Sequence, residues 1–386
     1  MIMVALLVVG FAALLVGALS LSALNSARQE RTSAALKKAK EALIGRAVSD
    51  DNMPSSLPCP DTNDDGSSEL LSGNDCPSYI GRLPWRTLNL PDLRDGSGER
   101  LWYAMSPAFR DDNSAQPLNS NTKGTLLVYD TDGASLQTQA GYSAVAVIFA
   151  PGSTLSTQTR STVAQQNSAA NYLDTANGTN NATGLSYATP RFIAGAKTDT
   201  FNDRLLFITT QDLMPLVEQR VAGEVKRALD KYFTDNGYYP WADTIGAAAN
   251  YNSDNGENRG WLPDDASGGG TANWPLGYPA PWFIGNQWYT LIYYSVAKNY
   301  TPDPAGCSSC IDFTLSVNGI NGVKVLFFMP GTYSGTRAID ELSHYLEDPE
   351  NNQDTTPTAP DDHYVIPTSQ DRDRDRLYRF TTTWTP

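Results

Sequence analysis

The N-terminal stretch changes from wholly apolar to amphipathic along one uninterrupted helical pattern. Residues 1–24 (MIMVALLVVGFAALLVGALSLSAL) carry no charge. At about 1.5 Å per residue they are long enough to cross a hydrocarbon core of about 30 Å as a helix. Residues 25–48 contain no proline, and their apolar positions recur at steps of three and four: Ala35, Leu36, Ala39, Ala42, Leu43 and Ala47. We therefore predict one helix from Met1 to about Val48, with a transmembrane segment in its first half.

The remaining sequence repeats one order of elements. Five matches follow one another in both copies: Ala42-Leu43 with Ala228-Leu229, Trp102-Tyr103 with Trp288-Tyr289, Pro151-Gly152 with Pro330-Gly331, Tyr172-Leu173 with Tyr345-Leu346, and Arg204-Leu205 with Arg376-Leu377. The offset falls slowly, from 186 (288 minus 102) to 172 (376 minus 204). Each copy predicts a helix, a turn-rich loop, an aromatic strand, an apolar strand ending in Pro-Gly, a polar segment and a final strand.

This order predicts an α+β fold with a long N-terminal membrane helix followed by two tandem lobes. Each lobe is expected to pack one helix on an antiparallel sheet. We place the transmembrane helix at 1–34, the first lobe at 35–214 and the second lobe at 215–386. The helix of the second lobe has Asp212 as a candidate cap and ends at Asn236-Gly237.

Two apolar runs and two polar segments complete the expected lobes. Residues 144–150 and 323–329 are nearly continuous apolar runs, which is typical of central strands covered by a helix. Residues 153–198 and 332–370 are rich in Ser, Thr, Asn and Asp, and we expect them to be surface loops with little core.

Charge and cysteine content narrow the class of protein. With 42 acidic and 28 basic residues, the net charge of −14 argues against nucleic-acid binding, which needs a basic surface. The cysteines form two local pairs, Cys59 with Cys76 and Cys307 with Cys310, which indicates disulfides in an oxidising space such as a periplasm. A zinc site made of four thiolates is the alternative.

The chain resembles a type IV pilin-like protein, in the sense of a minor pilin or a type II secretion pseudopilin. The resemblance rests on the apolar helix that becomes amphipathic, on the helix-then-sheet order, and on residues 93–103 (LRDGSGERLWY), which are similar to a pseudopilin stretch reading Asp-Pro-Trp-Gly-x-Pro-Tyr. It implies a structural subunit of a type IV pilus or pseudopilus that binds other pilin or pseudopilin subunits through its N-terminal helix. Such a subunit is anchored in the inner membrane before assembly, with its lobes in the periplasm or on an extracellular filament.

Two departures from the family pattern bear on the position in a filament. Family precursors carry a short basic leader that is cut after a glycine, whereas this sequence starts in the apolar run. Most family members have a glutamate at the fifth mature position, where Ala5 stands here. The missing glutamate resembles minor subunits at a filament tip, and a duplicated head is expected to crowd a lattice of major subunits.

A candidate calcium loop lies between the first two cysteines. Asp61, Asn63 and Asp65 alternate before Gly66, which resembles the front half of a calcium-binding loop, with Glu69 as a further ligand. Family members often hold a loop at a sheet edge with calcium. The alternative is a surface turn rich in Asp and Asn, held by a bridge from Cys59 to Cys76.

The second lobe is rich in aromatic residues, among them Trp241, Trp261 and Trp282. One interpretation is that they fill a small core. The other is an exposed patch that binds a partner, which favours an anchored binding protein or adhesin.

The sequence predicts no enzyme. It has only two histidines, His344 and His363, and it contains no phosphate loop and no HExxH motif. The remaining alternative is a glycan-acting enzyme that uses Asp92, Asp95 and Glu99.

Overall fold

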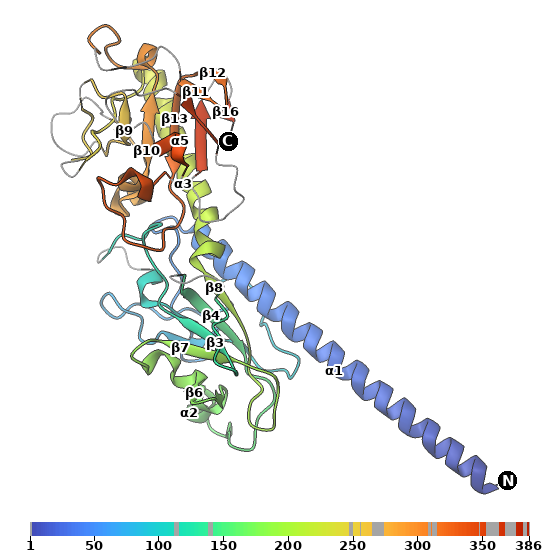
Figure 1. Cartoon of the computed structure of the whole chain (residues 1–386). Helices are drawn as coiled ribbons and strands as arrows, with labels where there is room; N and C mark the ends of the chain where they lie inside the picture. Colours follow the sequence, from blue (N-terminus) through green and yellow to red (C-terminus); the bar gives the residue numbers. More distant parts are fainter. Residues whose placement is uncertain are drawn as a thin grey trace.

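The first element of this computed structural model is a single long helix. The structure describes residues 2–111, 116–137, 142–246, 250–254, 256–264, 274–307, 310, 315–346, 348–352, 363–366, 376–380 and 384–385. Helix α1 (Ile2–Ser49) has 48 residues, as the sequence predicts, and its N-terminal half extends away from the rest of the chain (Figure 1). Five of the six predicted apolar positions are buried, Ala35, Leu36, Ala39, Leu43 and Ala47, and Ala42 is partly buried.

The predicted membrane location is overturned. Side chains of α1 are described from Ser22 onward, and residues 2–21 contribute a described backbone only. In the part of the chain that the structure describes, no helix is both long and apolar enough to cross a membrane. This finding contradicts the predicted single-pass anchor in the inner membrane.

The C-terminal half of α1 packs on an antiparallel sheet of four strands. The strands are β1 (Ile80–Arg82), β2 (Trp102–Met105), β4 (Ala144–Ala150) and β8 (Arg204–Thr209), in the order β1-β2-β4-β8. All seven residues of β4 are buried, because both faces of the sheet are covered. The α+β class with antiparallel sheets is therefore confirmed.

The second sheet has the same topology as the first, with one added edge strand. Its strands are β9 (Arg259–Trp261), β10 (Tyr293–Val296), β13 (Val325–Met329), β15 (Arg376–Phe380) and β16 (Trp384–Thr385), in the order β9-β10-β13-β15-β16. Ala150 lies opposite Arg204 in the first sheet, and Met329 lies opposite Arg376 in the second. This is the register that the Pro-Gly and Arg-Leu matches predict.

One match is displaced. Trp102 lies opposite Phe149 on β4, and Tyr293 lies opposite Phe328 on β13, so Tyr293 is the counterpart of Trp102. Trp288 instead lies in a 3-10 helix, η4 (Trp288–Leu291), that precedes the strand. Sequence similarity aligned two Trp-Tyr pairs that occupy different positions in the fold.

Helix α3 (Thr210–Asn236) follows β8 without a loop and runs from the first lobe into the second (Figure 1). Thr209 is its N-cap, and Asp212 completes the capping box from the third helical position. Gly237 ends the helix in the left-handed conformation. Asp212 also accepts a hydrogen bond from Lys40 Nζ of α1 at 3.0 Å, which joins the two helices.

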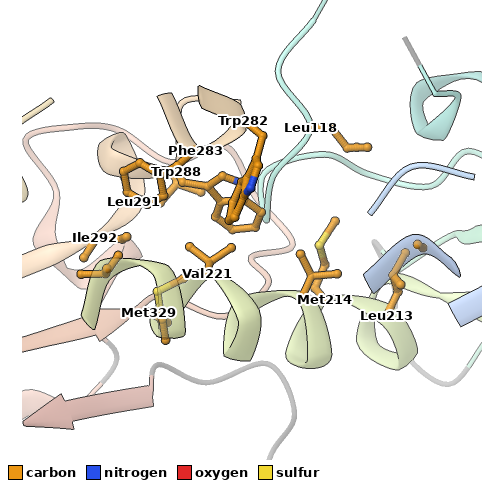
Figure 2. Close-up of a cluster of buried hydrophobic side chains, with 14 of the residues drawn as sticks. Leu118, Leu213, Met214, Val221, Trp282, Phe283, Trp288, Leu291, Ile292 and Met329 are labelled. Carbon is orange, nitrogen blue, oxygen red and sulfur yellow. The ribbon is translucent and has the colours of Figure 1, made fainter. Parts of the chain in front are cut away.

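Side chains of both lobes gather along α3. Figure 2 shows α3, which carries Leu213, Met214 and Val221, with Leu118 of the first lobe and with Trp282, Phe283 and Met329 of the second lobe around it. All of these residues belong to one hydrophobic cluster. The cluster is continuous from α1 to β15, so the two sheets share one core.

Polar contacts hold the same junction. Arg220 of α3 donates to the carbonyl oxygens of Val48 and Asp50 at 2.6 Å each, which satisfies acceptors at the end of α1. Glu218 is fully buried and accepts from Ser120 of the first lobe and from Arg376 of β15. Burial raises the pKa of Glu218.

The polar segment after β4 differs from the prediction, because it has a core of its own. Tyr172, Leu173 and Phe192 from this segment are buried against Trp102 and Phe149 of the first sheet. The segment therefore covers the sheet face opposite α1. The polar composition hid this role because the buried residues are few and irregularly spaced.

Short elements complete the described chain. They are α2 (Val163–Gln166), α4 (Pro281–Gly285), α5 (Pro349–Asn352), β3 (Leu127–Asp130), β5 (Thr175–Ala176), β6 (Thr179–Asn180), β7 (Arg191–Ala194), β11 (Leu315–Val317), β12 (Ile320–Val323), β14 (His363–Tyr364), and the 3-10 helices η1 (Pro107–Phe109), η2 (Ala169–Asn171), η3 (Asn181–Ser186), η5 (Lys298–Tyr300) and η6 (Leu342–His344).

The first prediction concerns Gly260 of β9. Its φ is +150°, and a Cβ there would lie 1.8 Å from the Asp243 carbonyl oxygen. Gly260→Ala is expected to lower the free energy of unfolding by about 2–4 kcal/mol. Gly223→Ala on α3, where nothing lies within 4 Å, is expected to raise it by about 0.5–1 kcal/mol. Urea unfolding measures the free energy of unfolding of both variants. Equal changes in Gly260→Ala and Gly223→Ala would contradict the close packing of β9 against Asp243.

Candidate functional site

An arginine-rich pocket lies beside β1 where three segments of the first lobe meet. The segments are the loop between Cys59 and Cys76, the loop before β2, and the polar segment after β4. The pocket has a volume of about 290 Å³, and its lining residues are mostly polar: Asp64, Arg82, Arg94, Glu99, Arg100, Thr154, Arg160, Gln166 and Tyr172.

The loop before β2 is fixed by Asp95, which is 1% exposed. Its Oδ1 accepts the backbone N–H groups of Ser97 and Glu99, and its Oδ2 accepts that of Gly152. The N–H of Gly96 donates to Thr32 Oγ1 of α1 at 2.9 Å. Residues 93–103 therefore contact α1 at the level where the helix enters the first lobe.

Asp92 holds two of the pocket arginines from one side. Its carboxylate accepts from Arg94 Nη2 at 2.7 Å and from Arg100 Nε at 2.9 Å. Burial alone would raise the pKa of Asp92, but these charge-assisted bonds outweigh it and lower the pKa. Asp92, Asp95 and Glu99 thus serve as partners of arginines and backbone N–H groups.

The other two arginines meet at Tyr172. The guanidinium of Arg82 lies 4.7 Å from the centre of the Tyr172 ring, and that of Arg160 lies 3.9 Å from it. Arg82 Nε contacts Asp64 at 2.8 Å, and Arg160 Nη1 contacts Glu99 at 2.7 Å. Both arginine side chains are at least nine-tenths buried.

The candidate calcium residues form hydrogen-bonded turns. The carboxylate of Asp61 accepts the N–H groups of residues 63, 64 and 66, and Asn63 and Asp65 each accept the N–H two residues further on. Glu69 accepts from both the N–H and the hydroxyl of Thr62. Among the described residues, no group of three or more His, Cys, Asp or Glu could hold a metal ion. These contacts match the alternative turn, and the calcium site stays a prediction.

Both predicted disulfides form, Cys59–Cys76 around this loop and Cys307–Cys310 in the second lobe. Trp241 is buried against Cys307 and Cys310.

The three second-lobe tryptophans expected at a binding surface are buried. Trp241 is 1% exposed, Trp261 is 0% and Trp282 is 8%. Trp261 contacts the Tyr345 ring at 4.5 Å, and Trp282 lies 5.2 Å from the guanidinium of Arg220. The exposed partner-binding patch expected of these three residues is therefore not present. Their spacing along the chain gave no sign of which side each ring faces.

The histidines have structural contacts. His344 Nδ1 accepts the N–H of Ala338 at 3.1 Å, and its ring lies 4.9 Å from that of Tyr333. His363 belongs to β14, which pairs with β11.

Asp61 has a counterpart in the second lobe, Asp243. Each forms a backbone bridge to the end of the first strand of its sheet, Asp61 to Arg82 and Asp243 to Trp261. Burial raises the pKa of Asp61, but three backbone N–H groups oppose the shift. Burial, together with the neighbouring carboxylate of Asp254, raises the pKa of Asp243 to about 7, although the hydrogen bond that it accepts from the Tyr251 N–H opposes the shift.

No protein-family model, curated protein or solved structure matches this chain.

Sequence reasoning singled out the cysteines and the carboxylates near the pocket but missed Arg82 and Arg160. Comparison of the two repeats could have pointed to Arg82, because the strand register places Arg82 of β1 at the position that Trp261 occupies in β9. An arginine in place of a buried tryptophan marks a site where the two copies differ in chemistry. The displaced Trp-Tyr match concealed this correspondence.

The second prediction concerns the pH dependence of stability. The ordinary pKa of an aspartate is 3.8, and that of Asp243 is about 7, so the folded chain retains a proton that the unfolded chain has lost. The resulting stabilisation is present at low pH and is lost as the pH rises from about 4 to about 7, by at most about 1.4 kcal/mol per pH unit.

Asp243→Asn is expected to flatten the decline of unfolding free energy over this range, because the amide does not titrate. Asp235→Asn, at the exposed end of α3, serves as the control and is expected to keep the wild-type slope. Denaturant unfolding at several pH values measures the slopes. An unchanged slope in Asp243→Asn would show that the pKa of the Asp243 carboxyl group is not raised by folding.

Proposed function

We propose that the chain is a structural subunit of a helical filament, assembled through the N-terminal half of α1. The observation that carries this proposal is the projection of that half beyond the lobes, together with its apolar, uncharged sequence (Figure 1).

The boundary between the two halves of α1 is defined by contacts with the first lobe. Residues 22–31 are all exposed, and Thr32 is the first buried residue among the described side chains of α1. Arg204 donates to the Gln29 carbonyl oxygen, and the Thr32 hydroxyl accepts from Gly96. The lobe therefore packs against α1 from about Gln29 onward, and the preceding turns contribute little to its core.

The preceding turns need a partner for physical reasons. Residues 1–24 carry no charge, and exposing their side chains to water costs about 25 cal/mol per Å² of apolar surface. Packing against the same kind of helix in neighbouring subunits removes this surface from water. Small residues such as Gly10, Ala12, Ala13 and Gly17 allow close approach of helices.

The two repeated sheets support the finer proposal of two tandem pilin-like lobes in a minor, tip-located subunit of a type IV pilus or type II secretion pseudopilus. Each sheet has one long helix packed against it, α1 in the first lobe and α3 in the second. A head of two lobes joined through one core is too bulky to repeat in every position of a tight helical lattice.

The competing functions have weaker support. A binding protein that uses Trp241, Trp261 and Trp282 would need these rings at the surface, where they are not. A glycan-acting enzyme would need available carboxylates, whereas Asp92 and Glu99 pair with arginines. We therefore propose a non-enzymatic role.

The third prediction tests assembly by cysteine crosslinking. All four native cysteines are in disulfides, so an introduced cysteine is the only free thiol. Leu24→Cys places it on the exposed, projecting part of α1, where the side chain is 57% exposed. Thr234→Cys, at the exposed end of α3, is the matched control.

Both variants are treated with a short thiol crosslinker in host cells that microscopy shows to carry filaments. Leu24→Cys, paired with a cysteine variant of the filament subunit, is expected to yield crosslinked species that Thr234→Cys does not. Failure of Leu24→Cys to crosslink any better than the control would overturn the proposal.

A further inference from the structure

We propose that the arginine-rich pocket of the first lobe binds an oxyanion, the carboxylate or phosphate group of a small ligand. This inference does not depend on filament assembly, because all the residues that line the pocket belong to the first lobe and none of them to α1.

The pocket holds more positive than negative charge. Its lining contains four guanidiniums, those of Arg82, Arg94, Arg100 and Arg160, and two carboxylates, those of Asp64 and Glu99. Asp92, which pairs with Arg94 and Arg100 from outside the lining, leaves an excess of one positive charge (4 minus 3). The whole chain has a net charge of −14, so a cluster of four arginines is contrary to its overall charge. Charge held in a partly enclosed cavity attracts a counter-ion more strongly than the same charge on an open surface.

The arginines are fixed before any ligand arrives. Arg82 Nη2 donates to the Gln166 carbonyl oxygen at 2.7 Å and to the Tyr172 hydroxyl at 3.0 Å. Arg160 Nε donates to the Asn171 carbonyl oxygen at 2.8 Å. Because these groups are already ordered, a ligand pays little conformational entropy for their alignment.

Arg82 retains a donor for a ligand. Its Nε contacts Asp64 and its Nη2 is doubly engaged, while its Nη1 has no partner among the described residues. Planar guanidinium groups match the two oxygens of a carboxylate or phosphate.

The second lobe shows that the fold does not require an arginine at this position. By strand register, Trp261 of β9 is the counterpart of Arg82 of β1. Trp261 is fully buried against Tyr345, whereas Arg82 lies on Tyr172, the match of Tyr345 in the repeat. In the second lobe this position therefore holds a buried apolar ring, whereas in the first lobe it holds an arginine that lines a charged pocket. The sheet is stable with either, which points to a ligand as the reason for the arginine.

Glu99 sets the affinity, because its carboxylate competes with a ligand for Arg160. Neutralising Glu99 is therefore expected to strengthen anion binding, whereas removing a pocket arginine is expected to weaken it. These opposite effects distinguish binding at a defined site from non-specific attraction of anions to a positively charged surface.

The fourth prediction uses NMR titration of the arginine Nε–Hε signals of the full chain. Inorganic phosphate and acetate are added separately at constant ionic strength, so that the two oxyanion types are distinguished. The variants are Arg94→Gln, which lines the pocket and is 39% exposed, and Glu99→Gln. Arg31→Gln, on the exposed part of α1, is the control.

At least one of the two anions is expected to shift the pocket signals with saturation. Arg94→Gln is expected to weaken binding about tenfold, Glu99→Gln to strengthen it, and Arg31→Gln to leave it unchanged. Absence of saturable shifts with both anions would overturn the proposal. Equal binding by Arg94→Gln and Arg31→Gln, with melting temperatures showing that both are folded, would also overturn it.

Discussion

Burial of one face of α3, from Thr210 to Tyr232, is the constraint on which the two-lobed structure depends. The helix starts in the capping box at Thr209, packs against α1, and continues under the second sheet. Its buried residues come from both halves, from Leu213 and Met214 to Leu229 and Tyr232. Because one helix contributes to the core that the two lobes share, relative movement of the lobes would expose apolar surface.

Polar contacts give this arrangement a defined orientation. Arg220 binds the end of α1, and Glu218 links Ser120 of the first lobe to Arg376 of the second. Removing one partner of a buried ion pair generally lowers the free energy of unfolding by about 3–5 kcal/mol, because it leaves an uncompensated buried charge. The junction is therefore specific as well as apolar. The lobes present a single body to anything that α1 joins.

Much of this architecture follows from sequence periodicity, and the parts that do not have physical reasons. The apolar positions at steps of three and four from Ala35 to Ala47 predict the second half of α1, and Gly237 marks the end of α3. The apolar run of β4 gives a central strand, and the Pro-Gly repeat gives the correct register for β4 and β13. Local patterns could not show which aromatic rings face inward, so Trp241 and its neighbours were open to two interpretations. They also could not show that the polar segment around Tyr172 folds back over the sheet, since that contact depends on residues distant in sequence. The arginine pocket was hidden for the same reason.

We propose that α1 has two parts, one that the lobes need in order to fold and one that assembly needs. Sedimentation velocity on the purified full chain, beside a chain that lacks residues 1–27, tests this division most directly. We expect the full chain to associate into oligomers in aqueous buffer and the shortened chain to sediment as a compact folded monomer. Identical sedimentation of the two chains, or an unfolded shortened chain, would contradict it.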